Sequence, residues 1–210
     1  MSASNQIAGR GQHDSIWESN ANQNLTLSVI FYPTFLLPKH QFWLSQAVAL
    51  GVRDFIAENT DKKVSIKWSN DIYIEHKKVA GILIQNSISG TSIMNSVVGI
   101  GVNINQSEFG FEGSQRATSL FLETNKIQKL ELMRYELCWH IEMRYLQLKR
   151  NHIHQIQSDY MDVLYQYQER KEYELPTGER FTGTIEGISP NGQLVINRNG
   201  DLLKFNVKEV

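Results

Sequence analysis

Two short segments could bring a carboxylate and an amine together. Residues 67–71 read Lys-Trp-Ser-Asn-Asp, a strand end followed by polar residues, and residues 77–83 read Lys-Lys-Val-Ala-Gly-Ile-Leu. If the turn between them centres on residues 75–76, Tyr73 pairs with Lys78 across a hairpin. Because side chains alternate along a strand, Asp71 then lies on the same face as Lys78, diagonally across the ribbon. Such a pair is either a surface salt bridge of little energetic value or a catalytic pair, and spacing alone favours neither.

Two glycine-containing segments could approach a ligand closely. Gly9-Arg10-Gly11 lets backbone N–H groups and a guanidinium converge on an anion, although a surface turn with an exposed Arg is the alternative. Gly99 and Gly101 interrupt a predicted strand, which indicates close approach by another backbone or a ligand. Asn103 could read an adenine edge with its amide, or it could cap a bulge.

The histidines and the cysteine offer less chemistry. His152 and His154 lie two residues apart without a third ligand nearby in sequence, so a solvated helix face is expected. Cys138 is the only cysteine, which excludes an internal disulfide and a cysteine-based zinc site. It lies beside Leu137 in a predicted helix, and we expect it to be a small core residue. No metal-binding residues are expected.

The composition indicates a globular protein. The 210 residues are 41% hydrophobic and carry 21 Lys+Arg against 22 Asp+Glu, a net charge of −1. Near-neutral charge argues against nucleic-acid binding. No apolar run approaches the roughly 18 residues that a membrane span needs, so no membrane partner is expected. The polar N-terminus predicts no signal peptide, and the single cysteine favours a cytoplasmic location.

The elements around these segments predict an α+β fold. A short strand is expected within residues 2–8, followed by a loop over 9–23. Apolar residues at helical spacing predict a buried helix over 41–58. Alternating β-branched and aromatic residues predict the remaining strands, at 25–32, 64–68, 72–74, 79–84 and 93–103. Strands that follow one another in hairpins predict a mixed, largely antiparallel sheet rather than an alternating parallel fold.

A second region follows a long helical segment. Residues 128 to about 168 are predicted to form two amphipathic helical segments that break near Asn151. Beyond Arg170, short strands alternate with turn residues at 176–178, 190–192 and 199–201, which predicts a small β-barrel of about 40 residues. We therefore predict two domains, residues 1–168 and 169–210.

Taken in order, the segments resemble the biotin protein ligases, the biotin–[acetyl-CoA-carboxylase] ligases. The family's Ala-Gly-Arg-Gly run ending at Trp appears at 8–17, and its Lys-Trp-Pro-Asn-Asp pattern appears at 67–71 with Ser69 in place of Pro. Its Lys-hydrophobic-Ala-Gly-Ile-Leu pattern appears at 78–83, and its Gly-x-Gly-x-Asn-x-Asn strand at 99–105. The resemblance covers essentially all of the chain. It implies a class II synthetase-like catalytic domain with helices on one face of the sheet, followed by an SH3-like barrel.

The resemblance also implies a two-step reaction with biotin and ATP as substrates and Mg²⁺. The biotin carboxylate attacks the α-phosphate to give biotinyl-5′-adenylate, and a lysine of a biotin carboxyl carrier protein then displaces AMP. Family patterns imply catalytic roles for Arg10, Lys78 and Asp71, with Asp71 taking the proton of the acceptor lysine. They imply biotin contacts at Gln6, Gly9, Arg10, Lys78 and Gly81. They imply ATP or adenylate contacts at Gly11, Gln12, Trp17, Lys67, Asn70 and Asn103.

The chain departs from the family at its start. The first strand and helix of the family's catalytic domain, with a Ser/Thr-Asn motif for the biotin ureido ring, have no counterpart, so we expect either a misplaced start or a shortened protein. No helix-turn-helix segment precedes the catalytic region, so the monofunctional type without repressor activity is expected, as a monomer or homodimer. Asp14 brings negative charge toward the phosphate loop.

Two alternatives remain beside an active biotin ligase. One is a degenerate module that binds nucleotide or carrier without turnover, which the missing N-terminal motif and Asp14 favour. The other is a related lipoate or octanoyl transferase. The retained Arg10, Asp71, Lys78 and Asn103 favour the ligase over the degenerate module, because packing does not explain them.

Overall fold

A six-stranded sheet forms the centre of the molecule, in a computed structural model that describes residues 1–11, 16–110 and 116–210. Its strand order is β1-β4-β8-β7-β6-β5, and every neighbouring pair of these strands is antiparallel, where a mixed, largely antiparallel sheet was predicted. Its strands are β1 (Ser2–Ala3), β4 (Leu25–Phe31), β5 (Val64–Lys67), β6 (Asp71–Ile74), β7 (Lys77–Ser89) and β8 (Ser92–Val102). The long β7–β8 hairpin turns at Gly90, where a positive φ of 57° suits glycine.

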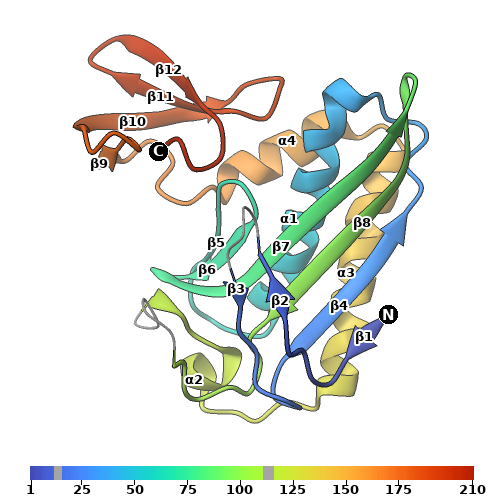
Figure 1. Cartoon of the computed structure of the whole chain (residues 1–210). Helices are drawn as coiled ribbons and strands as arrows, with labels where there is room; N and C mark the ends of the chain where they lie inside the picture. The colour runs from blue at the N-terminus through green and yellow to red at the C-terminus, as the bar shows by residue number, and fades with distance from the viewer. Residues whose placement is uncertain (12–15, 111–115) are drawn as a thin grey trace.

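Helices cover one face of this sheet (Figure 1). The 3₁₀ turn Pro38–His40 leads into α1 (Gln41–Glu58), which has the predicted bounds and buries Leu44 and Phe55 completely. The helical region that follows is divided into α3 (Leu130–Lys149) and α4 (Ile153–Asp162). Asn151 separates them with a φ of 62°, a left-handed conformation that ends a right-handed helix.

Two features of the helices differ from expectation. A short helix, α2 (Leu120–Thr124), was not predicted; the Ser119 hydroxyl caps it by accepting a hydrogen bond from the Leu122 N–H. The prediction that Cys138 is a core residue is wrong, because its side chain is exposed. Leu137 and Ile141, four residues apart on α3, are the buried ones. One residue further along, the helix has turned by about 100°, which carries Cys138 toward solvent.

A second, four-stranded antiparallel sheet follows α4. It has the order β12-β11-β10-β9 and comprises β9 (Arg170–Glu174), β10 (Arg180–Ile188), β11 (Leu194–Arg198) and β12 (Asp201–Phe205). The connections between its strands contain the predicted turn residues. The β10–β11 turn packs on the rest of the molecule: Trp68 Nε1 donates a hydrogen bond to the Gly192 carbonyl at 3.0 Å. A Cβ on Gly192 would lie 2.6 Å from Phe42 Cγ, so the backbone touches α1 directly.

Candidate functional site

A cavity of about 610 Å³ lies against the large sheet. Its floor consists of alternate residues of three neighbouring strands, Thr26 and Ser28 of β4, Gly81, Leu83 and Gln85 of β7, and Val97, Gly99 and Gly101 of β8. Of the residues between them, Val98 is buried in the core, and Leu27, Ile82 and Ile100 border the cavity although they are largely buried in the core. Because strand side chains alternate between faces, one face builds the core and the other builds this cavity.

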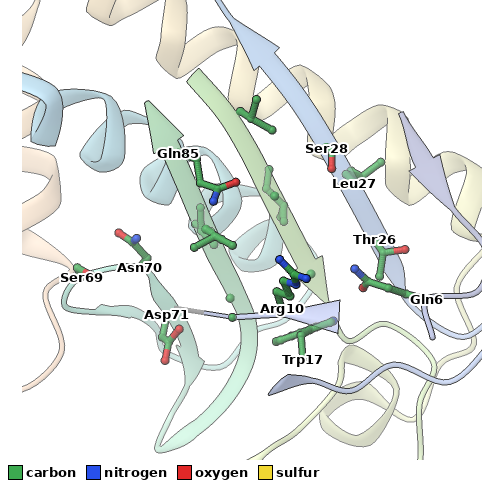
Figure 2. Close-up of a pocket in the computed structure, with 18 of the residues that line it drawn as sticks. Gln6, Arg10, Trp17, Thr26, Leu27, Ser28, Ser69, Asn70, Asp71 and Gln85 are labelled. Carbon is green, nitrogen blue, oxygen red and sulfur yellow. The ribbon is translucent and has the colours of Figure 1, made fainter. Parts of the chain in front are cut away.

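Arg10 and Trp17 lie at one end of this floor (Figure 2). A loop was predicted over residues 9–23, but Arg10 and Trp17 belong to two short paired strands, β2 (Gly9–Arg10) and β3 (Ile16–Trp17). The Trp17 ring lies flat against β8, since a Cβ on Gly101 would lie 2.3 Å from Trp17 Cε2. The predicted close approach at Gly101 is therefore made by a side chain of the protein itself. The indole Nε1 of Trp17 is buried without a partner among the described residues.

The predicted carboxylate–amine pair is present in the cavity. Tyr73 pairs with Lys78 across the β6–β7 hairpin, as expected. Lys78 Nζ lies 2.7 Å from Asp71 Oδ1 and 5.9 Å from the centre of a Trp17 ring. Both side chains of the pair are about one-third exposed, at 34% and 36%. A pair with this exposure contributes little stability, so its position beside a cavity suits chemistry better than folding.

The β5–β6 connection supplies a second set of polar groups. Asn70 is 7% exposed and its carbonyl accepts a hydrogen bond from the Ile82 N–H at 3.1 Å. Ser69 is 9% exposed, its carbonyl accepts a hydrogen bond from the Tyr160 hydroxyl, and its peptide bond with Trp68 is cis. In the described part of the chain, the Ser69 hydroxyl and the Asn70 carboxamide oxygen have no hydrogen-bond partner. Buried polar groups normally have partners, so these two oxygens are exceptions beside the cavity.

Most of the predicted site residues meet in this cavity. Those that line it are Gln6, Arg10, Gly11, Trp17, Asn70, Asp71, Lys78 and Gly81. Arg10 and Lys78, together with Lys208, set three cations against one acidic side chain, Asp71, among the described lining residues. This balance attracts an anion. Gln12 and Asp14 lie outside the described residues.

Three predicted residues do not line the cavity. Gly9 packs on the backbone of Trp17, where a Cβ would lie 2.2 Å from the Trp17 carbonyl oxygen. Asn103 is 4% exposed and donates from its amide to the Thr118 carbonyl at 3.0 Å, while its carboxamide oxygen has no partner in the described structure. Lys67 lies with Nζ 5.5 Å from the centre of the Tyr73 ring.

The surroundings of Lys67 and Tyr73 change their ionisation. Desolvation lowers the pKa of Lys67; the Asp71 carboxylate opposes this, whereas Arg116 and Lys78 lower it further. Burial raises the pKa of Tyr73 to about 12, and the negative charge of Asp71 adds to the effect. Tyr73 therefore stays neutral at physiological pH, and cannot serve as a base there.

Sequence reasoning missed several lining residues. Thr26, Ser28 and Gln85 face the cavity by strand alternation, so a search for polar residues on the outer face of the sheet could have found them. Val207, Lys208 and Val210 come from the segment after β12. No sequence pattern places them there, because their position depends on how the second sheet packs on the first.

In residues 1–11, 16–110 and 116–210, no group of three or more His, Cys, Asp or Glu side chains could hold a metal ion. None of the helices in these ranges is long and apolar enough to cross a membrane.

Known proteins resemble both the sequence and the fold. Residues 2–103 match the biotin/lipoate A/B protein ligase family. The bifunctional ligase/repressor BirA of Bacillus subtilis is 37% identical over 123 residues, which are 56% of this chain and 37% of that protein. The chain thus spans well under half the length of this relative. The biotin–[acetyl-CoA-carboxylase] ligase of Mycobacterium tuberculosis is 28% identical over 201 residues, covering 94% of this chain and 73% of the relative.

The structural comparison covers the second sheet as well. The biotin protein ligase from Aquifex aeolicus, solved in complex with biotin and ATP, superposes with a TM-score of 0.82 at 25% identity. The match includes 99% of this chain and 85% of that one. The similarity of sequence to the biotin/lipoate A/B protein ligase family over residues 2–103 and the similarity of fold to a biotin protein ligase over nearly the whole length agree.

Proposed function

We propose that this chain attaches biotin to a lysine of a biotin carboxyl carrier protein through biotinyl-5′-adenylate. The observation that carries the proposal is the Asp71–Lys78 pair at 2.7 Å, on a cavity that Arg10 also lines. The relatives named as biotin–[acetyl-CoA-carboxylase] ligases and the Aquifex complex with biotin and ATP support the choice of substrates. In this proposal residues 1–168 form the catalytic domain and residues 169–210 an SH3-like domain.

The first step joins biotin to the α-phosphate of ATP. A biotin carboxylate oxygen attacks the α-phosphorus, the bond to the β-phosphate oxygen breaks, and pyrophosphate leaves. Arg10 and Lys78 donate hydrogen bonds to the oxygens on which negative charge builds, and each well-placed donor contributes about 3 kcal/mol to such a transition state. Lys78 bridges the biotin carboxylate and the α-phosphate. To do so, it gives up its contact with Asp71. Gln6 and Gly81 contact biotin, while Gly11, Trp17 and Asn70 contact the nucleotide.

The second step transfers biotin to the acceptor lysine. An unperturbed lysine has a pKa of about 10.4, so its ammonium must lose a proton before the nitrogen can attack. Asp71 accepts that proton once Lys78 has turned to the phosphate. The lysine nitrogen then forms an amide bond with the biotinyl carbon and gives its second proton to the departing phosphate or to water. AMP leaves with the electrons of the broken anhydride bond.

Mg²⁺ fits these residues as a companion of ATP. Magnesium is commonly held by one or two carboxylates, substrate phosphates and water, so a site without a cluster of acids suffices. Asp71 and the unpartnered Asn70 oxygen are the oxygen donors of the cavity that would face it. When bound, the ion neutralises phosphate charge.

Pyrophosphate release with and without biotin tests the proposal. We expect release from MgATP that depends on biotin and stops when EDTA removes the magnesium. ATP binding without biotin-dependent release would instead indicate a module that binds nucleotide without turnover. Lipoate serves as the specificity control, because effective competition by lipoate would place the chain with the lipoate ligases of the same family.

A further inference from the structure

The α3 helix is apolar on two opposite sides. On its inner side, Leu137 and Ile141 are buried in the core. On its outer side, four large apolar side chains, each at least 41% exposed, recur at the spacing of one helical face: Leu132, Tyr135, Trp139 and Met143. A surface helix normally turns polar residues outward, and a helix that is apolar all round is normally covered on every side. These four residues, the outer stripe, therefore indicate a surface that another protein chain covers.

The outer stripe lies far from the cavity of the proposed active site. The α3 helix packs on the core face of the large sheet, where the ring centre of its Tyr145 lies 4.4 Å from that of Phe31 of β4. The cavity lies on the other face of the same sheet (Figure 1). A groove of about 390 Å³ between α1 and α3 borders the stripe at Trp139 and Met143. A second protein molecule can therefore seat large side chains at the stripe and leave the cavity open.

Charges along α3 indicate which kind of molecule fits. Glu131 and Glu136 are exposed near the start of the helix, and Lys149 and Arg150 are exposed at its end. Successive helical residues turn by about 100°, which places all four on the same outer side as the stripe. The Glu131 carboxylate is 73% exposed and is only loosely paired with Arg134, at 4.0 Å. The outer side of α3 thus has an acidic start and a basic end.

A second α3 helix in antiparallel orientation matches this charge distribution. Glu131 of each copy then faces Lys149 and Arg150 of the other, so unlike charges meet at both ends of the contact. A parallel pair would place like charges together instead. A two-fold axis that crosses a helix at a right angle produces the antiparallel arrangement, and the same surface patch then serves both copies.

We infer that the outer stripe of α3 binds a second copy of this chain, with the two α3 helices antiparallel. Pairing of residue 131 with residues 149–150 centres the contact near residue 140, so Trp139 of each copy lies close to the two-fold axis. Because both cavities stay open, the dimer forms without biotin or ATP. The inference is independent of the proposed function.

Sedimentation velocity of the full chain tests the inference. We expect a dimer at concentrations of about 1–100 µM, the weak end of the range that specific interfaces cover. Trp139→Ser should raise the dimer Kd about 100-fold or more, because each dimer loses two large side chains at the centre of the contact. Leu202→Ser is the matched control, since Leu202 is 62% exposed on β12, and it should leave the Kd unchanged.

Two results of this experiment would overturn the inference. A chain that stays monomeric over the whole range would leave the stripe to a different protein. A dimer that Trp139→Ser does not weaken would be held together by another surface.

Charge reversal tests the antiparallel orientation. Glu131→Lys places like charges at both ends of the contact, as does the double variant Lys149→Glu/Arg150→Glu, so each protein alone should be monomeric. Mixing the two should restore the dimer, because both ends then join unlike charges. Lys204→Glu, an exposed reversal on β12, is the control and should dimerise as the unchanged protein does. Folded variants that do not associate when mixed overturn the inference, and urea denaturation of each variant establishes that it is folded.

Biotin-dependent pyrophosphate release separates this inference from the proposed function. Release per chain should be the same for Trp139→Ser and the unchanged protein, because the stripe and the cavity lie on opposite sides of the sheet. A loss confined to Trp139→Ser contradicts a dimer that leaves the cavities open. If the dimer forms and the charge reversals behave as expected, but no protein releases pyrophosphate, the dimer stands and the proposed activity fails.

Discussion

The proposed role of Lys78 in adenylate formation can be tested directly. We expect Lys78→Ala to slow biotin-dependent pyrophosphate release about 100- to 1,000-fold, because it removes one preorganised donor to the developing charge. The neighbouring Lys77→Ala is the control, since Lys77 is exposed and does not line the cavity. Single-turnover pyrophosphate release measures both. Normal turnover in Lys78→Ala would remove this residue from the mechanism.

Asp71→Asn distinguishes a base from a partner that only holds Lys78. The substitution keeps the size of the side chain but abolishes its ability to take a proton. We expect transfer from preformed biotinyl-adenylate to the carrier to fall about 100-fold or more, and adenylate formation to fall much less. Rapid-quench assays of each half-reaction provide the comparison. An equal loss in both steps would contradict the assignment of Asp71 as the base.

At the scale of single residues, the sequence predicted contacts that follow from strand alternation. The Tyr73–Lys78 pairing follows from a turn at residues 75–76. The approach of Asp71 to Lys78 was also predicted, but the register shifts between Ile72 and Tyr73, so that Asp71 pairs with Gly81, and no sequence pattern indicated that shift. The position of Trp17 against Gly101 could not be predicted in this way, because it joins segments more than 80 residues apart in sequence. The resemblance implied an adenine contact at Asn103, which stays a prediction; its side chain is buried and donates a hydrogen bond to the Thr118 carbonyl.

The β8 strand offers a test at the scale of one element. Gly99 and Gly101 lie on the same face, but a Cβ at Gly101 would overlap Trp17 at 2.3 Å, whereas the nearest atom to a Cβ at Gly99 is 3.8 Å away. We expect Gly101→Ala to lower the free energy of unfolding by about 1–3 kcal/mol through overpacking. Gly99→Ala should change it by less than about 0.5 kcal/mol. Urea denaturation of both variants would show equal effects only if Trp17 does not rest on Gly101.

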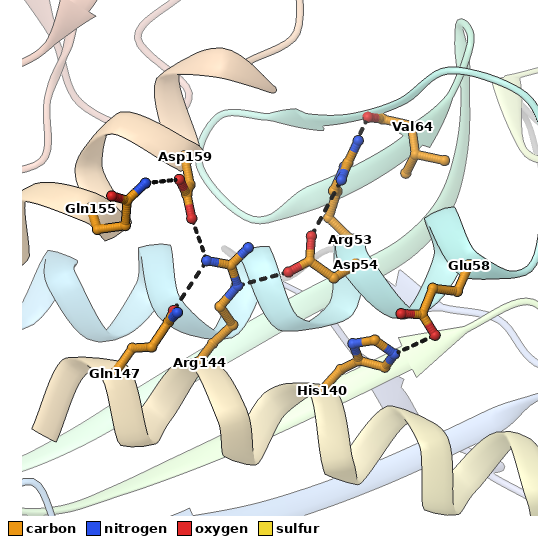
Figure 3. Close-up of polar contacts among 9 residues, drawn as sticks. All are labelled: Arg53, Asp54, Glu58, Val64, His140, Arg144, Gln147, Gln155 and Asp159. Carbon is orange, nitrogen blue, oxygen red and sulfur yellow. Dashed lines mark hydrogen bonds and ion pairs between the residues drawn. The ribbon is translucent and has the colours of Figure 1, made fainter. Parts of the chain in front are cut away.

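Arg144 joins three helices (Figure 3). It donates from Nε to Asp54 of α1 at 2.7 Å and from Nη1 to Asp159 of α4, while its own helix is α3. Burial alone would lower the pKa of Arg144, but the hydrogen bonds to the two carboxylates raise it. The guanidinium is therefore held charged between the helices, and its side chain is only 18% exposed.

Removing this guanidinium leaves two carboxylates without their partner. We expect Arg144→Ala to lower the free energy of unfolding by about 3 kcal/mol. Arg134→Ala on the same helix is the control, because Arg134 lies 4.0 Å from Glu131 in an exposed pair and should cost less than about 0.5 kcal/mol. Thermal or urea unfolding measures the difference, and similar losses would mean that the network does not hold the helices together.

The sequence predicted the long, periodic elements and missed the short ones. The α1 helix has the expected bounds because its apolar residues recur over 18 positions. The α2 helix has five residues, and β2 and β3 have two each, too few for a periodic pattern to form. These short elements depend on tertiary contacts and on a single cap, which a sequence pattern does not reveal.

Packing of the second sheet on the first determines part of the site. Gly192 and Gly178 are both turn glycines with a φ of +84°, but only Gly192 contacts another element, at Phe42. Gly178→Ala should therefore report backbone strain alone, about 1 kcal/mol. Gly192→Ala should cost about 1–3 kcal/mol more, because its methyl group displaces Phe42. If urea denaturation gives the same loss of unfolding free energy for both variants, the contact between the β10–β11 turn and Phe42 does not stabilise the protein.

At the scale of the whole molecule, the strands of the second sheet were predictable and their placement was not. Turn residues at 176–178, 190–192 and 199–201 predicted where the strands begin and end. The contribution of Val207 and Lys208 to the cavity follows from the Trp68–Gly192 hydrogen bond and the Phe42 contact, neither of which leaves a pattern in the sequence.

The alternation that builds the cavity floor also has an evolutionary consequence. On β7, positions 81, 83 and 85 face the cavity, while Ala80 and Ile82 belong to the core. A slip of one residue would exchange the two sets, so selection for folding fixes the register. Within that register the two sets of positions can mutate separately. The ligand preference of such a floor can therefore drift over generations while the fold that carries it stays the same.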